Sequence, residues 1–254
     1  MAVDKSLNNI TVVNTRPAHQ SEALTKRIEL YSGQVIEVPL FFIQAETKQA
    51  IEKQIDSRPK PDILIFVSAN AAHTLLPHYT PEENTTIIAI GPSTAQAIQH
   101  YGIRVDAMPL EYNSQGILAL QELSNVCNKT IFISCGYESR DELQPKLSAR
   151  EASVILLESY CRVFLPPDET ALPSLINQSI DAIIITSLAS LTYLHKAFFP
   201  EHTTWLYQQQ LLVITAEQAK IALSMGFKKT PWICHNASIK SIVDCLLTHA
   251  NSDH

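Results

Sequence analysis

The sequence predicts an α/β protein made of two similar domains, each a parallel sheet with helices on both faces. Short, continuously apolar runs alternate with segments of helical periodicity, which is typical of parallel strands buried on both sides. Residues 62–71 (DILIFVSANA) and 181–190 (DAIIITSLAS) repeat one strand-to-helix pattern about 120 residues apart, the length of a small domain rather than of a solenoid unit. A chain of 254 residues is long enough for two domains. The place between two similar halves is where we first expect a functional site.

The first half alternates predicted strands and helices in order. Leu24, Ile28 and Tyr31 recur at helical spacing, and Gly33 follows as a stop signal. The predicted strands of this half are 10–14, 35–39, 63–67 and 87–90, and its predicted helices are 21–31, 69–76, 94–100 and 114–123.

The second half repeats the alternation and completes the fold class. Its predicted strands are 131–134, 154–158, 183–186 and 212–214, and its predicted helices are 141–149, 189–197, 217–224 and 239–248. Residues 41–48 and 164–170 are the linker candidates, since Pro166 and Pro167 mark a break in the second. Two flavodoxin-like or Rossmann-like domains are the natural result.

Composition narrows the class of protein. A net charge of −6 and the lack of a basic run longer than Lys228-Lys229 argue against a nucleic-acid binder, which needs clustered cations. The five cysteines are an odd number without a C-x-x-C pair, so neither a disulfide framework nor a thiolate metal site is expected. The first residues lack the apolar core of a signal peptide, and no apolar run is long enough to span a membrane, so we expect a cytoplasmic protein.

The glycines and histidines argue against bound cofactors. The chain has only 6 glycines, and none are spaced as in the phosphate-binding loops of dinucleotide or P-loop sites. His73 and His78 are five apart, and His195 and His202 seven apart, which does not fit a helical zinc site. We therefore expect no metal or organic cofactor.

Hydroxyl side chains stand where predicted strands end and helices begin. In open α/β sheets ligands bind at this edge, and helix N-termini there offer free N–H groups and partial positive charge. The sequence therefore predicts a site for carboxylates or phosphates, although each hydroxyl could equally be a plain helix cap. The residues are Ser68, Ser93, Thr94, Ser187 and Thr215.

Tyr160 lies between the predicted strand 154–158 and the Pro166-Pro167 break, and so in a predicted connector between the halves. A connector tyrosine can be a packing anchor. It can also present a phenol to a cleft as a general acid or hydrogen-bond donor.

Five motifs, taken in order, resemble the uroporphyrinogen-III synthase family over about residues 10–248. They are VNTRP at 13–17, GQVIEVPL at 33–40, VSANA at 67–71, IGPSTA at 90–95 and ESYCR at 158–162. The resemblance implies two α/β domains joined by a two-stranded linker that the chain crosses twice. The first domain would comprise residues 1–40 and 167–254, and the second 41–166 including the linker strands.

The resemblance also implies a reaction, the cofactor-free cyclisation of hydroxymethylbilane to uroporphyrinogen III. Loss of the terminal hydroxyl as water leaves an azafulvene, ring D attacks through its substituted carbon, and the resulting spiro intermediate recloses with ring D inverted. The family's tyrosine at the position of Tyr160 would assist departure of the hydroxyl. The resemblance further implies a monomer that receives its substrate from hydroxymethylbilane synthase.

The substrate is a polyanion, so an acidic protein must bind it through local donors. Arg16 and Arg140, each just after a first strand, are the candidate cations, although each could be a surface ion pair worth only about 0–1 kcal/mol. The second copy departs from the family pattern. At 215–218 it reads TAEQ, which places Glu217 where a carboxylate would dock and suggests a helix that caps itself.

Two other functions fit the same pattern. A two-domain small-molecule or polyanion-binding protein without catalysis is the main alternative, and the missing signal peptide counts against it. A two-domain glycosyltransferase is the second, and the scarcity of glycine counts against that.

Overall fold

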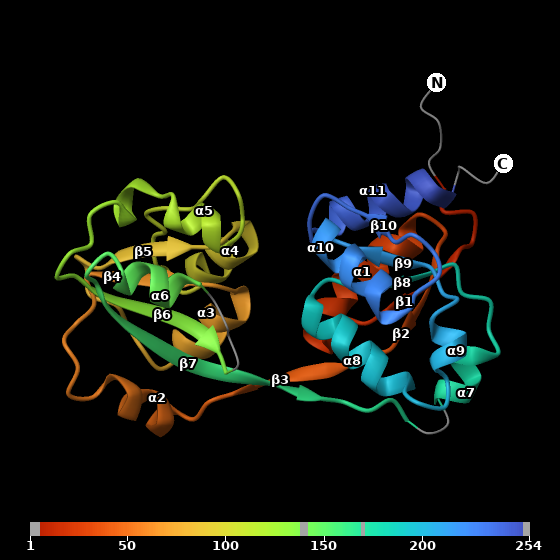
Figure 1. Cartoon of the computed structure of the whole chain (residues 1–254), viewed down its shortest axis with the longest axis horizontal. Coiled ribbons are helices and arrows are strands. Elements are labelled where there is room, and N and C mark those ends of the chain that lie inside the picture. The colour runs from red at the N-terminus through yellow and green to blue at the C-terminus, as the bar shows by residue number, and fades with distance from the viewer. Residues whose placement is uncertain (1–5, 138–141, 169–170, 251–254) are drawn as a thin grey trace. The chain divides into compact units, whose positions relative to one another are not determined.

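The computed structural model describes residues 6–137, 142–168 and 171–250 of the chain. The chain divides into two compact units. Unit 1 comprises 1–42 and 163–254, and unit 2 comprises 43–162. Each unit contains one five-stranded sheet (Figure 1).

The sheet of unit 1 is parallel, with strand order β10-β9-β8-β1-β2. Its central strands are entirely or almost entirely buried, as expected for a parallel sheet covered on both faces. The strands are β1 (Thr11–Asn14), β2 (Gln34–Glu37), β8 (Ala182–Ile184), β9 (Leu211–Val213) and β10 (Trp232–Ile233).

Two long helices of unit 1, α1 (Ala18–Leu30) and α11 (Ile239–Ala250), pack against each other. Their buried residues share one core cluster with β1, β8 and β9, which includes Leu24, Ile28 and Leu246. The remaining helices are α7 (Ala171–Ile176), α8 (Leu188–Phe198), α9 (Thr203–Leu206) and α10 (Ala216–Met225), of which α8 contacts both α9 and α10.

The sheet of unit 2 has the order β3-β7-β6-β4-β5, and its β7, β6, β4 and β5 are parallel. The strands are β3 (Phe41–Ala45), β4 (Ile63–Phe66), β5 (Thr86–Ala89), β6 (Thr130–Gly136) and β7 (Ser153–Phe164). The helices are α2 (Lys48–Ile55), α3 (Ala69–Leu75), α4 (Pro92–Gln99), α5 (Ser114–Leu118) and α6 (Leu143–Ser148), with a 3-10 turn at Gln121–Leu123.

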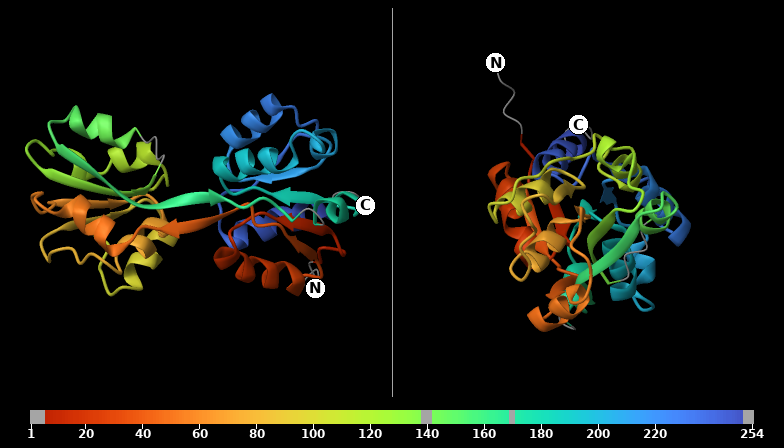
Figure 2. Two further views of the ribbon diagram at one scale, coloured as in Figure 1. Left: turned by 90° about the horizontal axis from the view of Figure 1, so that it is seen from below. Right: turned by 90° about the vertical axis from the view of Figure 1, so that its left-hand side faces the viewer.

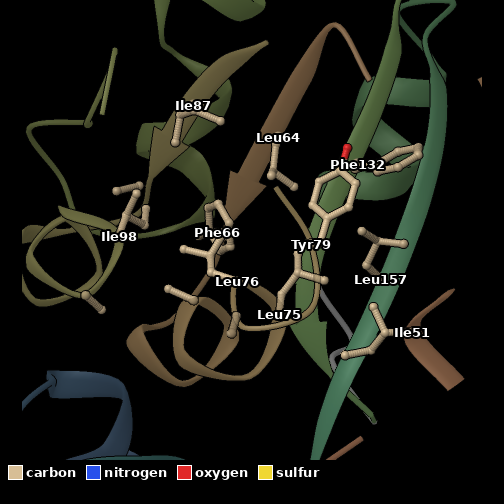
Figure 3. Close-up of a cluster of buried hydrophobic side chains, with 14 of the residues drawn as sticks. Ile51, Leu64, Phe66, Leu75, Leu76, Tyr79, Ile87, Ile98, Phe132 and Leu157 are labelled. Carbon is tan, nitrogen blue, oxygen red and sulfur yellow. The ribbon is translucent and has the colours of Figure 1, made fainter. Parts of the chain in front are cut away.

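Alternate side chains of β4 pack on opposite faces of this sheet, because successive side chains of a strand point to opposite sides. Leu64 and Phe66 join the cluster under α2, α3 and α4 (Figure 3). Ile63 and Ile65 join a second cluster with residues of α5 and α6. Both faces of the sheet are therefore covered, as the continuously apolar sequence predicts.

β3 and β7 lie side by side (Figures 1 and 2) and both continue across the boundary between the units. The N–H of Glu46 donates to Ser159 O at 2.9 Å, and the N–H of Leu165 donates to Leu40 O at 2.9 Å. Residue numbers rise along one strand as they fall along the other, so the two run antiparallel. The predicted boundaries lie after residues 40 and 166, and the two units divide after residues 42 and 162.

The structure corrects three local predictions. Residues 41–48 are not a plain linker, because they form β3 and begin α2. Tyr160 lies within a strand rather than after one, because β7 runs past the predicted end at residue 158 to Phe164 and continues across the boundary between the units. The predicted helix 114–123 is interrupted, and the Arg150 guanidinium donates to the carbonyls of Leu118 and Leu123 at 3.0 and 2.8 Å, so the helix can stop without leaving them unpaired.

Candidate functional site

An extra residue in β7 determines where the side chain of Tyr160 points. Opposite β6, Cys135 pairs with Glu158 but Gly136 pairs with Tyr160, so Ser159 is an added residue at a bulge. Ser159 and Tyr160 then both bond to α3 or its cap: Ser159 Oγ lies 2.7 Å from Thr74 Oγ1. The bulge therefore aims two adjacent polar side chains at one helix.

The Tyr160 hydroxyl has two polar partners. It lies 3.0 Å from Ser68 Oγ, and Nη2 of Arg162 donates to it at 3.4 Å. The Arg162 guanidinium also stands over the phenol ring, with Cζ 5.6 Å from the ring centroid, a cation–π arrangement. Tyr160 itself is 1% exposed, whereas Ser68 is half-buried and Arg162 is exposed.

Tyr137 follows β6 beside this group and was not predicted from the sequence. Its N–H donates to Tyr160 O at 2.8 Å. Partial burial, then the charge of Glu46 and a hydrogen bond with it, and finally the charges of Glu158 and Cys161 raise the pKa of the Tyr137 phenol.

Three of the predicted anion-binding hydroxyls cap their helices. Ser68 Oγ accepts from Ala71 N at 3.1 Å in α3, and Ser187 Oγ accepts from Ser190 N at 3.0 Å in α8. Thr215 Oγ1 accepts from Gln218 N at 3.1 Å in α10. The plain capping role that was the alternative at these positions is therefore present.

The α10 junction is closed further by its own side chains. Gln218 Oε1 accepts at 2.9 Å from the N–H of Ile214, the residue before the N-cap, so the side chain of Gln218 bonds back across the start of the helix. The self-capped helix expected from the 215–218 sequence is confirmed here.

Helix α4 begins differently, because its N-cap is Gly91 and no side chain caps it. Ser93 and Thr94 lie in its first turn rather than at the cap, Ser93 exposed and Thr94 buried. The first-turn N–H groups of α4 are thus left to other acceptors, in contrast to those of α3, α8 and α10.

Arg16 lies at the carboxyl end of β1 in unit 1. Its Nη2 donates to Ala237 O at 2.7 Å, and its Nε is buried without a partner among the described residues. Burial lowers the pKa of the guanidinium, and nearby Cys234 opposes that shift. No acidic side chain in the described part of the chain pairs with Arg16, so the surface ion pair considered from the sequence is not formed there. Arg140 lies outside the described residues.

Comparison with known proteins identifies the family of the chain. The family model for uroporphyrinogen-III synthase HemD matches residues 22–244. The chain belongs to the uroporphyrinogen-III synthase family. It is 25% identical over 231 residues to the uroporphyrinogen-III synthase of Escherichia coli K12, covering 86% of this chain and 93% of that one. The synthase of Salmonella typhimurium is 26% identical over 239 residues, with the same shares.

Solved uroporphyrinogen-III synthases share the fold. A mutant of the Thermus thermophilus enzyme superposes with a TM-score of 0.66 at 14% identity, covering 96% of this chain and 100% of that one. The Helicobacter pylori enzyme superposes with a TM-score of 0.63 at 15% identity, covering 94% and 99%. The predicted fold class and family are confirmed, and a uroporphyrinogen-III synthase is a cyclising lyase of porphyrin biosynthesis.

Other features of the described residues do not point to a different site. Among them, no group of three or more His, Cys, Asp or Glu side chains is placed to hold a metal ion. Nor does any described helix have both the length and the apolar character needed to span a membrane. A surface pocket of about 500 Å³ in unit 1 lies between β10 and α11, and none of the predicted site residues lines it.

Proposed function

We propose that this uroporphyrinogen-III synthase acts on hydroxymethylbilane through the polar group at the end of β7, with Tyr160 assisting departure of the substrate hydroxyl. The observation that carries the proposal is the 3.0 Å contact between the Tyr160 hydroxyl and Ser68 Oγ. It joins a phenol to the one strand-to-helix junction that both the sequence repeat and the family motif single out.

The task of the protein is chiefly to position a flexible chain. Hydroxymethylbilane closes by itself to the type I isomer, so the enzyme must hold ring D with its substituted carbon toward the azafulvene. Holding two reacting groups together in the right geometry can account for most of the lowering of the activation free energy. A proton donor near the leaving hydroxyl adds general acid catalysis, and a phenol is a suitable donor.

Binding of the polyanion rests on the strand-to-helix junctions and two cations. The uncapped start of α4, with Ser93 and Thr94 in its first turn, supplies backbone N–H donors. The unpartnered Nε of Arg16 is a donor without an internal acceptor. The full set of proposed substrate contacts is Arg16, Ser68, Ser93, Thr94, Arg140, Ser187 and Thr215.

The remaining parts of the proposal rest on the family resemblance and, for the location and the lack of a cofactor, on the sequence patterns given above. The enzyme works as a monomer in the cytoplasm, without a cofactor, and receives hydroxymethylbilane from hydroxymethylbilane synthase.

A coupled assay tests the function. Hydroxymethylbilane synthase supplies the substrate from porphobilinogen, and the product is oxidised and separated into type I and type III isomers. We expect the type III isomer to predominate only when the protein is present. Tight binding of hydroxymethylbilane with type I as the sole product would instead identify a polyanion-binding protein without catalysis.

A further inference from the structure

We propose that the Ser68 hydroxyl is the group that passes a proton to the leaving hydroxyl, and that Tyr160 acts behind it by replacing that proton. This inference rests on the proposed function and assigns Ser68 a catalytic role beyond substrate binding. It follows from exposure, hydrogen-bond direction and charge around the Tyr160 hydroxyl.

Exposure separates the two hydroxyls. Tyr160 is 1% exposed and packs in the core cluster under α3, whereas Ser68 is half-buried at the start of that helix. A substrate that approaches the carboxyl edge of the sheet meets Ser68 before Tyr160. The buried phenol therefore reaches the substrate through the 3.0 Å contact with Ser68 Oγ.

Either hydroxyl can be the donor in the contact between Tyr160 and Ser68, and the burial of the phenol favours donation from Tyr160, since its hydrogen has no solvent to bond to. The Tyr160 oxygen accepts from Arg162 Nη2, and its own hydrogen remains to be donated. Ser68 Oγ already accepts from Ala71 N as the cap of α3 and has a second lone pair for the phenol hydrogen. With Arg162 donating to Tyr160 and Tyr160 to Ser68, the Ser68 hydrogen points outward.

The step balances within this chain of groups. The Ser68 hydrogen moves to the leaving oxygen as the C–O bond breaks, and the bond's electron pair leaves with the water formed, so that ring A becomes a protonated, positively charged azafulvene. The phenol hydrogen moves to Ser68 Oγ in the same step, so no alkoxide forms. When ring D recloses, the proton lost from its free α-carbon returns by the same route to the phenolate.

Arg162 is a positioning residue in this scheme. It touches the phenol both at the oxygen and over the ring, and so it stabilises the negative charge that develops on Tyr160 in the relay.

Two substitutions of Ser68 distinguish its role as the N-cap of α3 from the role of its hydroxyl as a proton donor. Ser68→Asn keeps a good N-cap but has no hydroxyl, whereas Ser68→Thr keeps both. We expect Asn to slow type III formation about tenfold, like Tyr160→Phe, and Thr to stay within about threefold of the original rate. Thr47→Asn is the matched control, because Thr47 caps α2 in the same way, accepting from Ala50 N at 3.2 Å, and has no part in the site.

Non-additivity and isotope effects give readouts that a structural role would not move. Adding Ser68→Asn to Tyr160→Phe should slow the reaction no further, since both remove the same relay. A plot of the rate against the deuterium content of the solvent should be curved for the original enzyme, because two protons move in one step. It should be a straight line for either variant.

Arg162→Met should slow the original enzyme but should not slow the Tyr160→Phe variant further. Arg27→Met is its control, since Arg27 bonds and stacks on Tyr31 in the same manner on α1.

The outcomes separate this inference from the proposed function. If the original protein forms no type III isomer, the function itself is wrong. If it does, and Ser68→Asn keeps the full rate with a curved isotope plot, Ser68 is only a cap and the relay is wrong. If the rate reductions caused by Ser68→Asn and Tyr160→Phe multiply in the double variant, the relay is likewise wrong, because the two residues would then be independent donors.

Discussion

Gly136 leaves open the space that the ring of Tyr160 fills. A Cβ atom at Gly136 would stand 2.8 Å from both Cε2 and Cζ of that ring, closer than real Cβ contacts allow. Because Gly136 on β6 has no side chain, the phenol ring of Tyr160 on β7 can occupy this position.

Gly136→Ala should push the ring away from Ser68, because the added methyl group meets the end of the ring that bears the hydroxyl. We expect a loss of about 1–3 kcal/mol in the free energy of unfolding, as for other overpacked cores, and a slower type III reaction. Chemical denaturation and the coupled assay measure the two effects. Combining it with Tyr160→Leu should restore much of the stability but not the rate; a double variant as unstable as Gly136→Ala would show that the ring is not the obstacle.

Tyr160→Phe should slow type III formation about tenfold while the protein stays folded. The ring and its packing remain, and the lost hydrogen bond is worth about 1 kcal/mol of stability. General acid catalysis can contribute more, but positioning does most of the work in this reaction. Full type III turnover by the variant would leave Tyr160 as a packing residue, the alternative that the sequence also allowed.

Gly91→Ser should weaken substrate binding by giving α4 the cap that it lacks. The N-cap backbone is extended, with φ −172°, so serine causes no backbone strain. Its Cβ would stand 3.3 Å from Cβ and Cγ of Tyr112, so Tyr112 must shift slightly, and its Oγ would compete with a substrate carboxylate for the first-turn N–H groups. Stability should rise by a few tenths of a kcal/mol and the KM should rise severalfold. An unchanged KM with improved stability would mean that α4 does not bind the substrate.

Glu151→Asn should speed alkylation of Cys127. A hydrogen bond to Glu151, with Sγ 3.0 Å from Oε2, is the main cause that raises the pKa of this exposed thiol, followed by desolvation and the charge of Glu151. A higher pKa means less thiolate at a given pH, so removing the carboxylate shifts the rate-against-pH curve to lower pH. Asparagine suits the φ of 63° at this position. Peptide mass spectrometry after brief iodoacetamide treatment at pH 8 measures the rate, and an unchanged rate would contradict this account.

The sequence predicts well what depends on local patterns. The continuous apolar run of β4 and the serine that follows it specify a buried strand and a capped helix without reference to the rest of the chain. The self-capped start of α10 could be predicted for the same reason, because Thr215 and Gln218 are three residues apart and bond to each other and to the adjacent backbone.

The site at Tyr160 could be predicted only in part, because it depends on pairing between distant segments. β3 is a half-exposed edge strand whose neighbour is β7, more than a hundred residues away, so its own residues read as a linker. The bulge at Ser159 is a property of the β6–β7 register, and no local pattern marks it. Gly136 and Arg162 were missed for that reason, although Arg162 stands two residues from Tyr160, the spacing of side chains on one face of a strand.

The pairing of β1 with β8 has a consequence for how the protein is made. Strand β1 is translated before unit 2, but its partner Ala182–Ile184 is translated only after the whole of unit 2. Unit 2 can therefore fold while the growing chain is still attached, as domains generally do. The first segment of unit 1 must wait with its apolar strand unpaired on one side. Once residues up to about 165 are free of the ribosome, the chain carries a complete unit 2 and a β-α-β segment whose first strand still lacks one of its two neighbours.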